Sequence, residues 1–302
     1  MVVALITDVH LCDKPDAMGR HYKLAEAMLR TAMETARTYG AMALIELGDL
    51  KDQDHPPNPT TTREYARRAD RILHGLGVSV YHVVGNHEVD SITKDEFLAL
   101  IQRPAQVPPT ASFYASDLGS WRLIVLDANF RPDGTPLTQG DIYWQDPTIP
   151  PSQLEWLRAE LSRTSAPVLI AVHQRVDLDP PEPFAVQNSA EVRRILEHSG
   201  RVQLVLQGHS HQPAVRYIGG IWYYTLAALV DGDPCAPSWA LLELGRRNWN
   251  IRGFGAALSL TPKLNPPNPE WSPRLSRLGN VGPIRSEPIP PSPPAPAPSI
   301  QL

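Results

Sequence analysis

Histidine, carboxylate and amide side chains gather in this 302-residue chain directly after short aliphatic segments. The motifs in which they gather are Asp8-Val9-His10, Gly48-Asp49, Gly85-Asn86-His87-Glu88, the isolated His173, and Gly208-His209-Ser210-His211. Functional residues of an open α/β sheet collect beyond the carboxyl ends of its strands, so we expect these side chains to meet. Mixed imidazole and carboxylate ligands suit Mn, Fe or Zn, whereas an all-oxygen shell suits Mg or Ca. The motifs therefore predict a transition-metal site.

The spacing within the motifs predicts which side chains point the same way. A one-residue gap in extended chain places Asp8 and His10 on one side, where they could share an ion, and His209 and His211 have the same spacing. Each motif alone has an ordinary alternative, such as a polar strand end or a turn at Gly48-Asp49. All five in this order, each at a predicted strand end, favour a common site.

The number of ligands is sufficient for two ions. Two cations a few ångströms apart repel each other, so a shared carboxylate must offset their charge, and Asp49 is the natural bridge. Water near two cations ionises around neutral pH and can attack a phosphoryl group whose oxygens the ions hold. The pattern predicts phosphoester hydrolysis by a metal-bridging hydroxide.

Buried strands and crossover helices must position these motifs. The predicted strands of the first two thirds of the chain are Val2 to Thr7, Ala41 to Leu47, Val78 to Val84, Trp121 to Asp127, Val168 to Val172 and Val202 to Leu206. Apolar residues at helical spacing before Gly40 and Gly77 predict two crossover helices, which makes the first half βαβαβ. Shorter strands beyond Pro213 predict a second, partly antiparallel sheet.

Composition excludes several classes of function. The net charge of −4 gives no general reason to bind nucleic acid or an anionic membrane, so affinity for phosphate must be local. Two cysteines are too few for a disulfide framework, which suits a reducing compartment, and the chain begins directly in an apolar strand. We expect a cytoplasmic protein with no membrane span.

The C-terminal part has a different composition. Of the 32 prolines, 13 lie after Leu260, and the final stretch alternates Pro with Ser and Ala. We therefore expect a catalytic domain over 1–258 and a proline-rich, extended and disordered tail over 259–302. A solvated linker is the simpler interpretation of the tail, and a docking segment for a partner is the other.

The ordered motifs resemble the calcineurin-like metallophosphoesterase family, over roughly Val2 to Leu244. The resemblance implies a four-layer αββα sandwich with two mixed sheets and a dinuclear centre at the carboxyl ends of the strands. It implies that one ion is held by Asp8, His10, Asp49 and His211, and the other by Asp49, Asn86, His173 and His209. It further implies that His87 is catalytic, stabilising phosphoryl charge or protonating the leaving oxygen, and that Glu88 orients it.

The residues that would contact the substrate are less well specified. Arg175 could clamp a phosphate, or it could pair with a neighbouring aspartate. Asn86 is expected to contact the substrate as well as a metal ion. His21 and His55 could line the cleft. Residues around Asp127 resemble the branch that hydrolyses ADP-ribose and CDP-alcohols. Phosphomonoesters, phosphodiesters, cyclic nucleotides and nucleoside diphosphate derivatives all stay open as substrates, as does the oligomeric state. Mn is expected first, with Fe or Zn as alternatives.

A different class of function is also compatible with the fold. Some members of such a family serve as catalytically silent scaffolds after losing metal ligands, and a proline-rich tail would suit partner binding. Because every expected ligand position is filled here, the sequence favours catalysis.

Overall fold

The computed structural model describes residues 1–141 and 145–262, all within one compact unit, Met1–Ser272. Most of the expected tail lies outside the described residues. The strands are β1 (Val2–Ile6), β2 (Ala43–Glu46), β3 (Ser79–His82), β4 (Tyr114–Leu118), β5 (Trp121–Val125), β6 (Val168–Ala171), β7 (Val202–Gln207), β8 (Ala214–Ile218), β9 (Ile221–Thr225), β10 (Trp239–Leu244) and β11 (Trp249–Phe254). The helices are α1 (Ala25–Thr38), α2 (Pro59–His74), α3 (Lys94–Leu100), α4 (Pro151–Arg163) and α5 (Ser189–Ser199), with the 3₁₀ turns η1 (Tyr22–Leu24) and η2 (His87–Val89).

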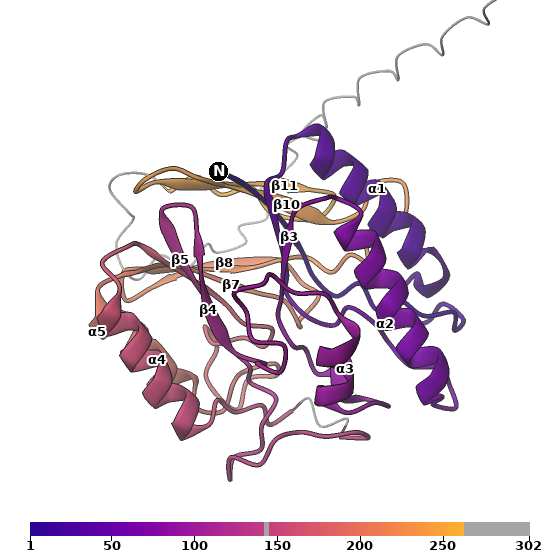
Figure 1. Cartoon of the computed structure of the whole chain (residues 1–302), viewed down its shortest axis with the longest axis horizontal. Coiled ribbons are helices and arrows are strands. Elements are labelled where there is room, and N and C mark those ends of the chain that lie inside the picture. The colour runs from indigo at the N-terminus through magenta and orange to yellow at the C-terminus, as the bar shows by residue number, and fades with distance from the viewer. Residues whose placement is uncertain (142–144, 263–302) are drawn as a thin grey trace, which may run out of the picture. The chain divides into compact units, whose positions relative to one another are not determined.

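The strands form two mixed sheets, one in the order β11-β10-β1-β2-β3 and the other in the order β4-β5-β6-β7-β9-β8. Helices α1, α2 and α3 lie on one side and α4 and α5 on the other, with the sheets between them (Figure 1). Alternation along β1 explains the layers, because Val3 and Leu5 pack between the sheets while Ala4 and Ile6 pack toward α1 and α2. The four-layer αββα sandwich with two mixed sheets is confirmed.

The last strands divide between the sheets, which corrects the expectation that a second sheet would begin beyond Pro213. β8 and β9 extend the second sheet, whereas β10 returns to pair antiparallel with β1, with Ala4 opposite Leu241. The second sheet begins earlier, at β4, which the sequence analysis did not identify. β4 and β11 are both edge strands with exposed residues between buried ones, so neither has a continuous aliphatic run.

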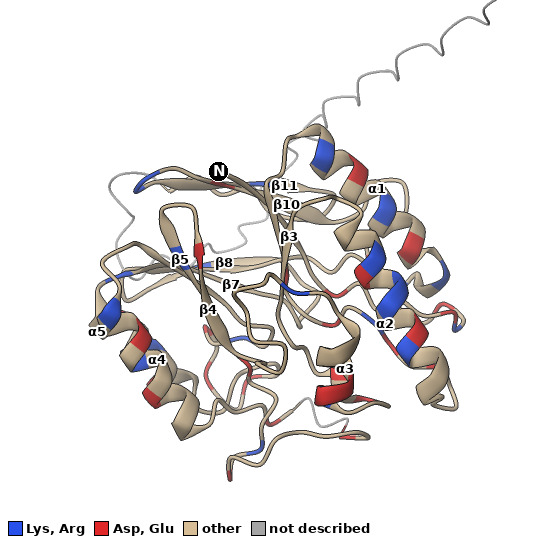
Figure 2. Ribbon diagram, viewed as in Figure 1, with Lys and Arg blue, Asp and Glu red and all other residues tan. Residues whose placement is uncertain are grey.

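Local signals set where several helices begin. Thr93 and Glu96 form a full capping box at α3, and the side chain of Asn58 caps α2. Asn188 precedes α5 but its side chain accepts a hydrogen bond from the backbone N–H of Ile149, 3.1 Å away, instead of capping the helix. The outer faces of α1 and α2 carry both signs of charge (Figure 2). Within the described part of the chain, no helix combines the length and apolarity that a membrane span needs.

Candidate metal centre

The predicted ligands lie in loops that leave strands of both sheets. Asp8 and His10 follow β1, Asp49 follows β2, and His173 and His209 follow β6 and β7. The loops approach closely, because a Cβ on Gly48 would meet the His173 ring at 2.7 Å. Glycine at this position therefore allows ligands from the two sheets to share one site.

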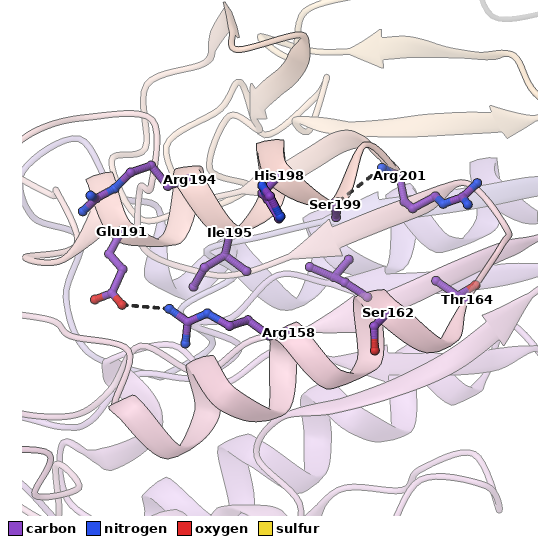
Figure 3. Close-up of a pocket in the computed structure, with 10 residues that line it drawn as sticks. Arg158, Ser162, Thr164, Glu191, Arg194, Ile195, His198, Ser199 and Arg201 are labelled. Atoms are coloured by element: carbon purple, nitrogen blue, oxygen red, sulfur yellow. Dashed lines mark hydrogen bonds and ion pairs between the residues drawn. The ribbon is translucent and has the colours of Figure 1, made fainter.

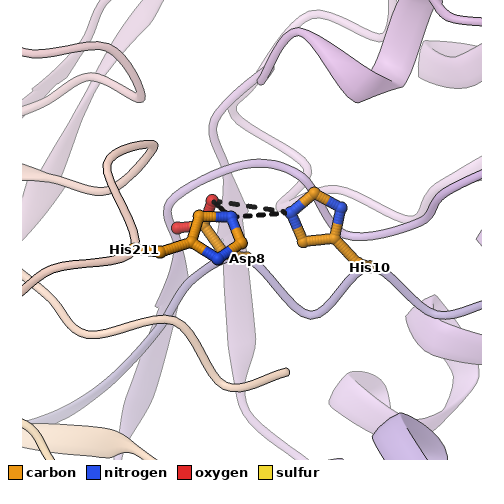
Figure 4. A group of neighbouring side chains, drawn as sticks. All are labelled: Asp8, His10 and His211. Atoms are coloured by element: carbon orange, nitrogen blue, oxygen red, sulfur yellow. Dashed lines mark hydrogen bonds and ion pairs between the residues drawn. The ribbon is translucent and has the colours of Figure 1, made fainter. Parts of the chain in front are cut away.

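One ligand group contains Asp8, His10 and His211, whose metal-binding atoms lie within 4.8 Å of one another. Oδ1 of Asp8 is 3.7 Å from Nε2 of His10 and 3.3 Å from Nε2 of His211, so both imidazoles point at one carboxylate (Figure 4). The two Nε2 atoms are 3.1 Å apart. This geometry matches the first ligand set that the family resemblance implies.

A second group contains Asp49, His173 and His209. Oδ2 of Asp49 lies 3.2 Å from Nε2 of His173 and 3.6 Å from Nε2 of His10. One carboxylate oxygen therefore faces ligands of both groups, which is the position that a bridging ligand needs. Asn86 begins the η2 turn, and its side chain is buried.

The backbone at the ligands differs from the extended chain on which the spacing argument relied. β1 ends at Ile6, and Asp8 and His10 have φ of 50° and 46°. Asp49, His209 and His211 also have positive φ, at 57°, 68° and 59°. Left-handed backbone is rare for such residues and gathers at functional sites, because surrounding structure must stabilise it. The ligands converge through strained turns and not through strand alternation.

Buried polar atoms without hydrogen bonds test whether metal ions fit. Within the described residues, Oδ1 of Asp8, Oδ1 of Asn86 and Nε2 of His173 are buried and form no hydrogen bond. Such atoms are costly unless they bind something. Because each is the atom that would bind an ion in the proposed sets, the residues present fit two divalent cations.

Outer contacts fix the histidine ligands. Nδ1 of His173 lies 2.7 Å from the carbonyl oxygen of Leu47, and Nδ1 of His211 lies 2.8 Å from Oδ2 of Asp231. Ligating histidines commonly donate their second N–H in this way, which leaves Nε2 free for the metal. Asp231 could not be predicted from the sequence, because it follows an apolar stretch and belongs to no recognisable motif.

The imidazole of His87 stands at the edge of this cluster, partly exposed. Its Nδ1 lies 3.3 Å from Oδ1 of Asp52 and 3.5 Å from Oδ2 of Asp90. Burial opposes its charge, but the carboxylates of Asp49 and Asp52 outweigh burial and raise the pKa of His87 well above its ordinary value. A protonated imidazole beside the ligand set can stabilise negative charge or donate a proton.

Glu88 has a different surrounding from the one expected. Its buried carboxylate accepts hydrogen bonds from the backbone N–H groups of Gly85, Asp49 and Leu50 at 2.6, 2.9 and 2.9 Å. It therefore ties together the loops after β2 and β3, while the His87 ring lies against Asp52 and Asp90 instead. Asp52 lies three residues after Asp49 and faces the His87 ring from the loop after β2.

The expected substrate contacts lie in varied surroundings. Arg175 is buried and its guanidinium holds Asp177 through two hydrogen bonds of 2.9 and 2.6 Å, so the fork that would clamp a phosphate is already engaged. His21 is half-buried with Nδ1 3.5 Å from Asp16, and His55 is exposed. None of these three residues belongs to a metal-ligand group within the described residues.

Two cations that the sequence analysis did not single out lie nearer the centre. Nη2 of Arg20 is 3.3 Å from Nε2 of His211, and Nζ of Lys14 is 2.8 Å from Oδ2 of Asp52. Both belong to the loop between β1 and α1. They bring positive charge next to the ligand set, where an anionic substrate would approach.

A hollow of ≈ 720 Å³ lies elsewhere, between α4 and α5 (Figure 3). Arg158 and Glu191 pair across it at 3.0 Å, and Arg194 and His198 also line it. None of the predicted site residues is among its lining.

Comparison with known proteins agrees with this geometry. The calcineurin-like phosphoesterase family matches residues 1–213 of the chain. A manganese-dependent ADP-ribose/CDP-alcohol diphosphatase of Danio rerio is 23% identical, with 85% of this chain and 96% of that protein aligned. Probable cyclic nucleotide phosphodiesterases of Psychrobacter arcticus and Rhodococcus erythropolis are 25% and 28% identical over 51% and 72% of this chain. The aligned part spans 53% and 66% of their own lengths.

Solved structures show the same fold. A dimetal phosphatase from Danio rerio superimposes with a TM-score of 0.71 at 20% identity, covering 86% of this chain and 98% of that one. The family match covers more than half of the chain, and its residues include both ligand groups. The chain therefore belongs to the calcineurin-like phosphoesterase family.

Proposed function

We propose that this protein is a dinuclear metal-dependent phosphohydrolase acting on small phosphorylated or nucleotide-like substrates. The observation that carries the proposal is the position of Asp49, whose Oδ2 faces His10 of one ligand group and His173 of the other at 3.6 and 3.2 Å. A shared carboxylate between two such groups suits a pair of cations.

The ligand assignment follows these groups. Asp8, His10, Asp49 and His211 would hold one ion, and Asp49, Asn86, His173 and His209 the other. When bound, the ions supply Lewis acidity and a water acidic enough to ionise near neutral pH. Manganese is the first choice because the relative that aligns over 96% of its length is manganese-dependent by name, with Fe or Zn as alternatives.

The chain's own residues complete the reaction. Charged His87 stabilises the phosphoryl oxygens and gives its proton to the leaving oxygen, held in place by Asp52 and Asp90. Glu88 fixes the loops that carry Asp49 and Asn86 through its hydrogen bonds to backbone N–H groups. The proposed substrate contacts are Asn86, Arg175, His21 and His55. Of these, Arg175 would first have to release Asp177 before it could bind a phosphate.

Among the possible substrates, nucleoside diphosphate derivatives such as ADP-ribose and CDP-alcohols are proposed first. The support is the alignment with the Danio rerio diphosphatase along nearly its whole length. Cyclic phosphodiesters are the second candidate, since two probable cyclic nucleotide phosphodiesterases also align, over a smaller share of their lengths. A cytoplasmic location is proposed with them, because Cys12 and Cys235 are both free thiols.

The silent-scaffold alternative predicts that ligand positions have been lost. Instead, every ligand position of the expected sets is filled, and six of the seven proposed ligands fall in two groups of neighbouring metal-binding side chains, which supports catalysis.

Metal content and hydrolysis of a chromogenic phosphodiester, measured on the same samples, test the proposal. Asp49→Ala should no longer bind two metal ions and should lose turnover. Asp117→Ala, which changes an exposed carboxylate on β4, should keep both the metal content and the turnover. Retention of two ions and full activity in Asp49→Ala would refute the shared-ligand assignment.

The role of His87 needs a separate variant. His87→Ala should keep two ions and lose roughly 10²–10⁴-fold in kcat, the usual contribution of a positioned acid. The matched control is His198→Ala, which changes an exposed histidine on α5. A panel of ADP-ribose, CDP-choline, cyclic nucleotides and simple monoesters then ranks the substrate classes by kcat/KM.

A further inference from the structure

Of the five groups of potential metal-binding side chains among the described residues, one shares no residue with the dinuclear centre or with His87. Asp70 and His74 are four residues apart on α2, so they share one face of the helix, and His82 ends β3 beside them. Their ligand atoms lie within 4.8 Å of one another. None of the three belongs to the ligand groups of the dinuclear centre.

The distances in this group match a small tetrahedral ion. Oδ1 of Asp70 is 3.2 Å from Nε2 of His82 and 3.4 Å from Nε2 of His74, which in turn is 3.3 Å from the carbonyl oxygen of Gln102. Ligand bonds of roughly 2.0–2.1 Å around tetrahedral zinc separate neighbouring ligand atoms by about 3.3 Å. These three distances are compatible with ligands around one ion, and they are equally those of ion pairs and a hydrogen bond.

A buried atom within the group also points to a ligand. Nε2 of His82, a residue that is 1% exposed, forms no hydrogen bond among the described residues, although it faces Oδ1 of Asp70 at 3.2 Å. A buried ring nitrogen without a hydrogen bond is costly, and a metal bond would satisfy it. His74, with 21% of its side chain exposed, leaves a route for an ion from solvent.

The surrounding contacts are those that support ligating residues. Nδ1 of His82 lies 3.1 Å from Oε2 of the buried Glu46, which orients the ring with Nε2 toward Asp70. Oδ2 of Asp70 accepts a hydrogen bond from Nε2 of Gln102 at 3.1 Å, which fixes that carboxylate. A carboxylate behind a ligating histidine is a common feature of zinc sites.

We propose that Asp70, His74 and His82 bind one Zn²⁺ ion, with the carbonyl oxygen of Gln102 at the fourth corner. Two imidazoles, a carboxylate and a carbonyl are a ligand set that suits zinc better than Mg²⁺, which prefers an octahedral shell of oxygens. The ion would join α2 to β3 and to the segment after α3, so its role is structural. This inference is independent of the proposed hydrolase activity.

Metal-stripped full-length protein can be titrated with Zn²⁺ in equilibrium dialysis. His74→Ala should bind one equivalent less than the unchanged chain, whatever the total, while His198→Ala binds the full number. His74 lies partly at the surface, so its truncation should leave the far-UV circular dichroism unchanged. Co²⁺ substituted for zinc should give intense tetrahedral absorption bands that are reduced in His74→Ala.

A second measurement separates binding from stability. Zinc should raise the Tm of the unchanged chain more than that of His74→Ala, because an ion that binds only the folded state stabilises it. Equal stoichiometry in the two proteins, or an equal rise in Tm, would overturn the proposal and leave the cluster as a protonated ion-pair network. Activity with Mn²⁺ on the best phosphoester should survive in His74→Ala, so a failure here is distinguishable from a failure of the hydrolase proposal.

Discussion

The carboxylate of Asp52 lies within reach of His87, with 3.3 Å between Oδ1 and Nδ1. Its other oxygen is 3.3 Å from Nδ1 of His10, one of the proposed metal ligands. One buried carboxylate therefore orients both the proposed acid and a proposed ligand.

Asp52→Asn should lower kcat by about 10–100-fold at saturating Mn²⁺, because the amide cannot hold the charged form of His87 as the carboxylate does. Steady-state kinetics across pH check this, since the pKa of His87 should fall and the active pH range should narrow from the alkaline side. Asp133→Asn, in an exposed turn, is the control. An unchanged pH profile would assign the orienting role elsewhere.

Glu88→Gln should mainly destabilise the loops after β2 and β3, and it should leave the proposed acid, His87, unchanged. The new amide group places N–H donors where the carboxylate accepted three backbone N–H groups, so at least one is left unsatisfied, at about 1–3 kcal/mol. Thermal unfolding and metal affinity should both fall, while the pH profile keeps its shape. A shifted profile with normal stability would instead support direct orientation of His87 by Glu88.

Gly208→Ala should disrupt the centre although it replaces no proposed ligand. The added Cβ would lie 2.1 Å from Oγ1 of Thr7 and 2.8 Å from Oδ2 of Asp8, so it must displace that carboxylate. Metal content should fall below two ions per chain. Gly200→Ala, where nothing lies within 4 Å of the added atom, should cost only about 1–2 kcal/mol of backbone strain and keep both ions.

Stability of the metal-free protein should decrease at alkaline pH through His82. Asp70 and Glu46 outweigh burial and raise the pKa of His82 from 6.5 to about 9. The stabilisation of the folded state by charged His82 is therefore complete below pH 6.5, the pKa of the unfolded chain, and is lost as the pH rises through the folded pKa of about 9. Unfolding in denaturant at pH 6 and pH 10, with chelator present, should differ by on the order of 1–3 kcal/mol. His82→Gln should reduce this difference, while His211 and His173, whose pKa values are also raised, to about 9 and about 10, account for what remains.

A chain ending at Pro262 should keep its Tm and its activity on small substrates, as the proposed division into a catalytic domain and a tail requires. The last described contacts hold Leu260 against Ile251, with backbone hydrogen bonds of 2.7 and 2.8 Å. A chain ending at Leu244 loses β11, the antiparallel partner of β10, and should unfold at lower temperature. Loss of activity in the longer truncation would contradict the proposed tail.

The sequence by itself determined the strands that are buried and the residues that end them. Aliphatic runs are continuous only where both faces of a strand are covered, so β1, β2, β6 and β7 could be identified, whereas β4 and β11, which have exposed residues between buried ones, could not. The motifs after the central strands also indicated the proposed ligands, because chemistry restricts the residue types that bind transition metals.

Tertiary structure decided what depends on distant segments. β10 pairs with β1 across more than 230 residues of chain, which no local pattern specifies. Asp52, Asp231, Arg20 and Lys14 acquire their places only when loops from different strands come together. The same holds for His82, whose contacts with Asp70 and Glu46 form because α2 packs beside β3 and β2. Contact between residues far apart in sequence follows from packing, and packing is a property of the whole fold.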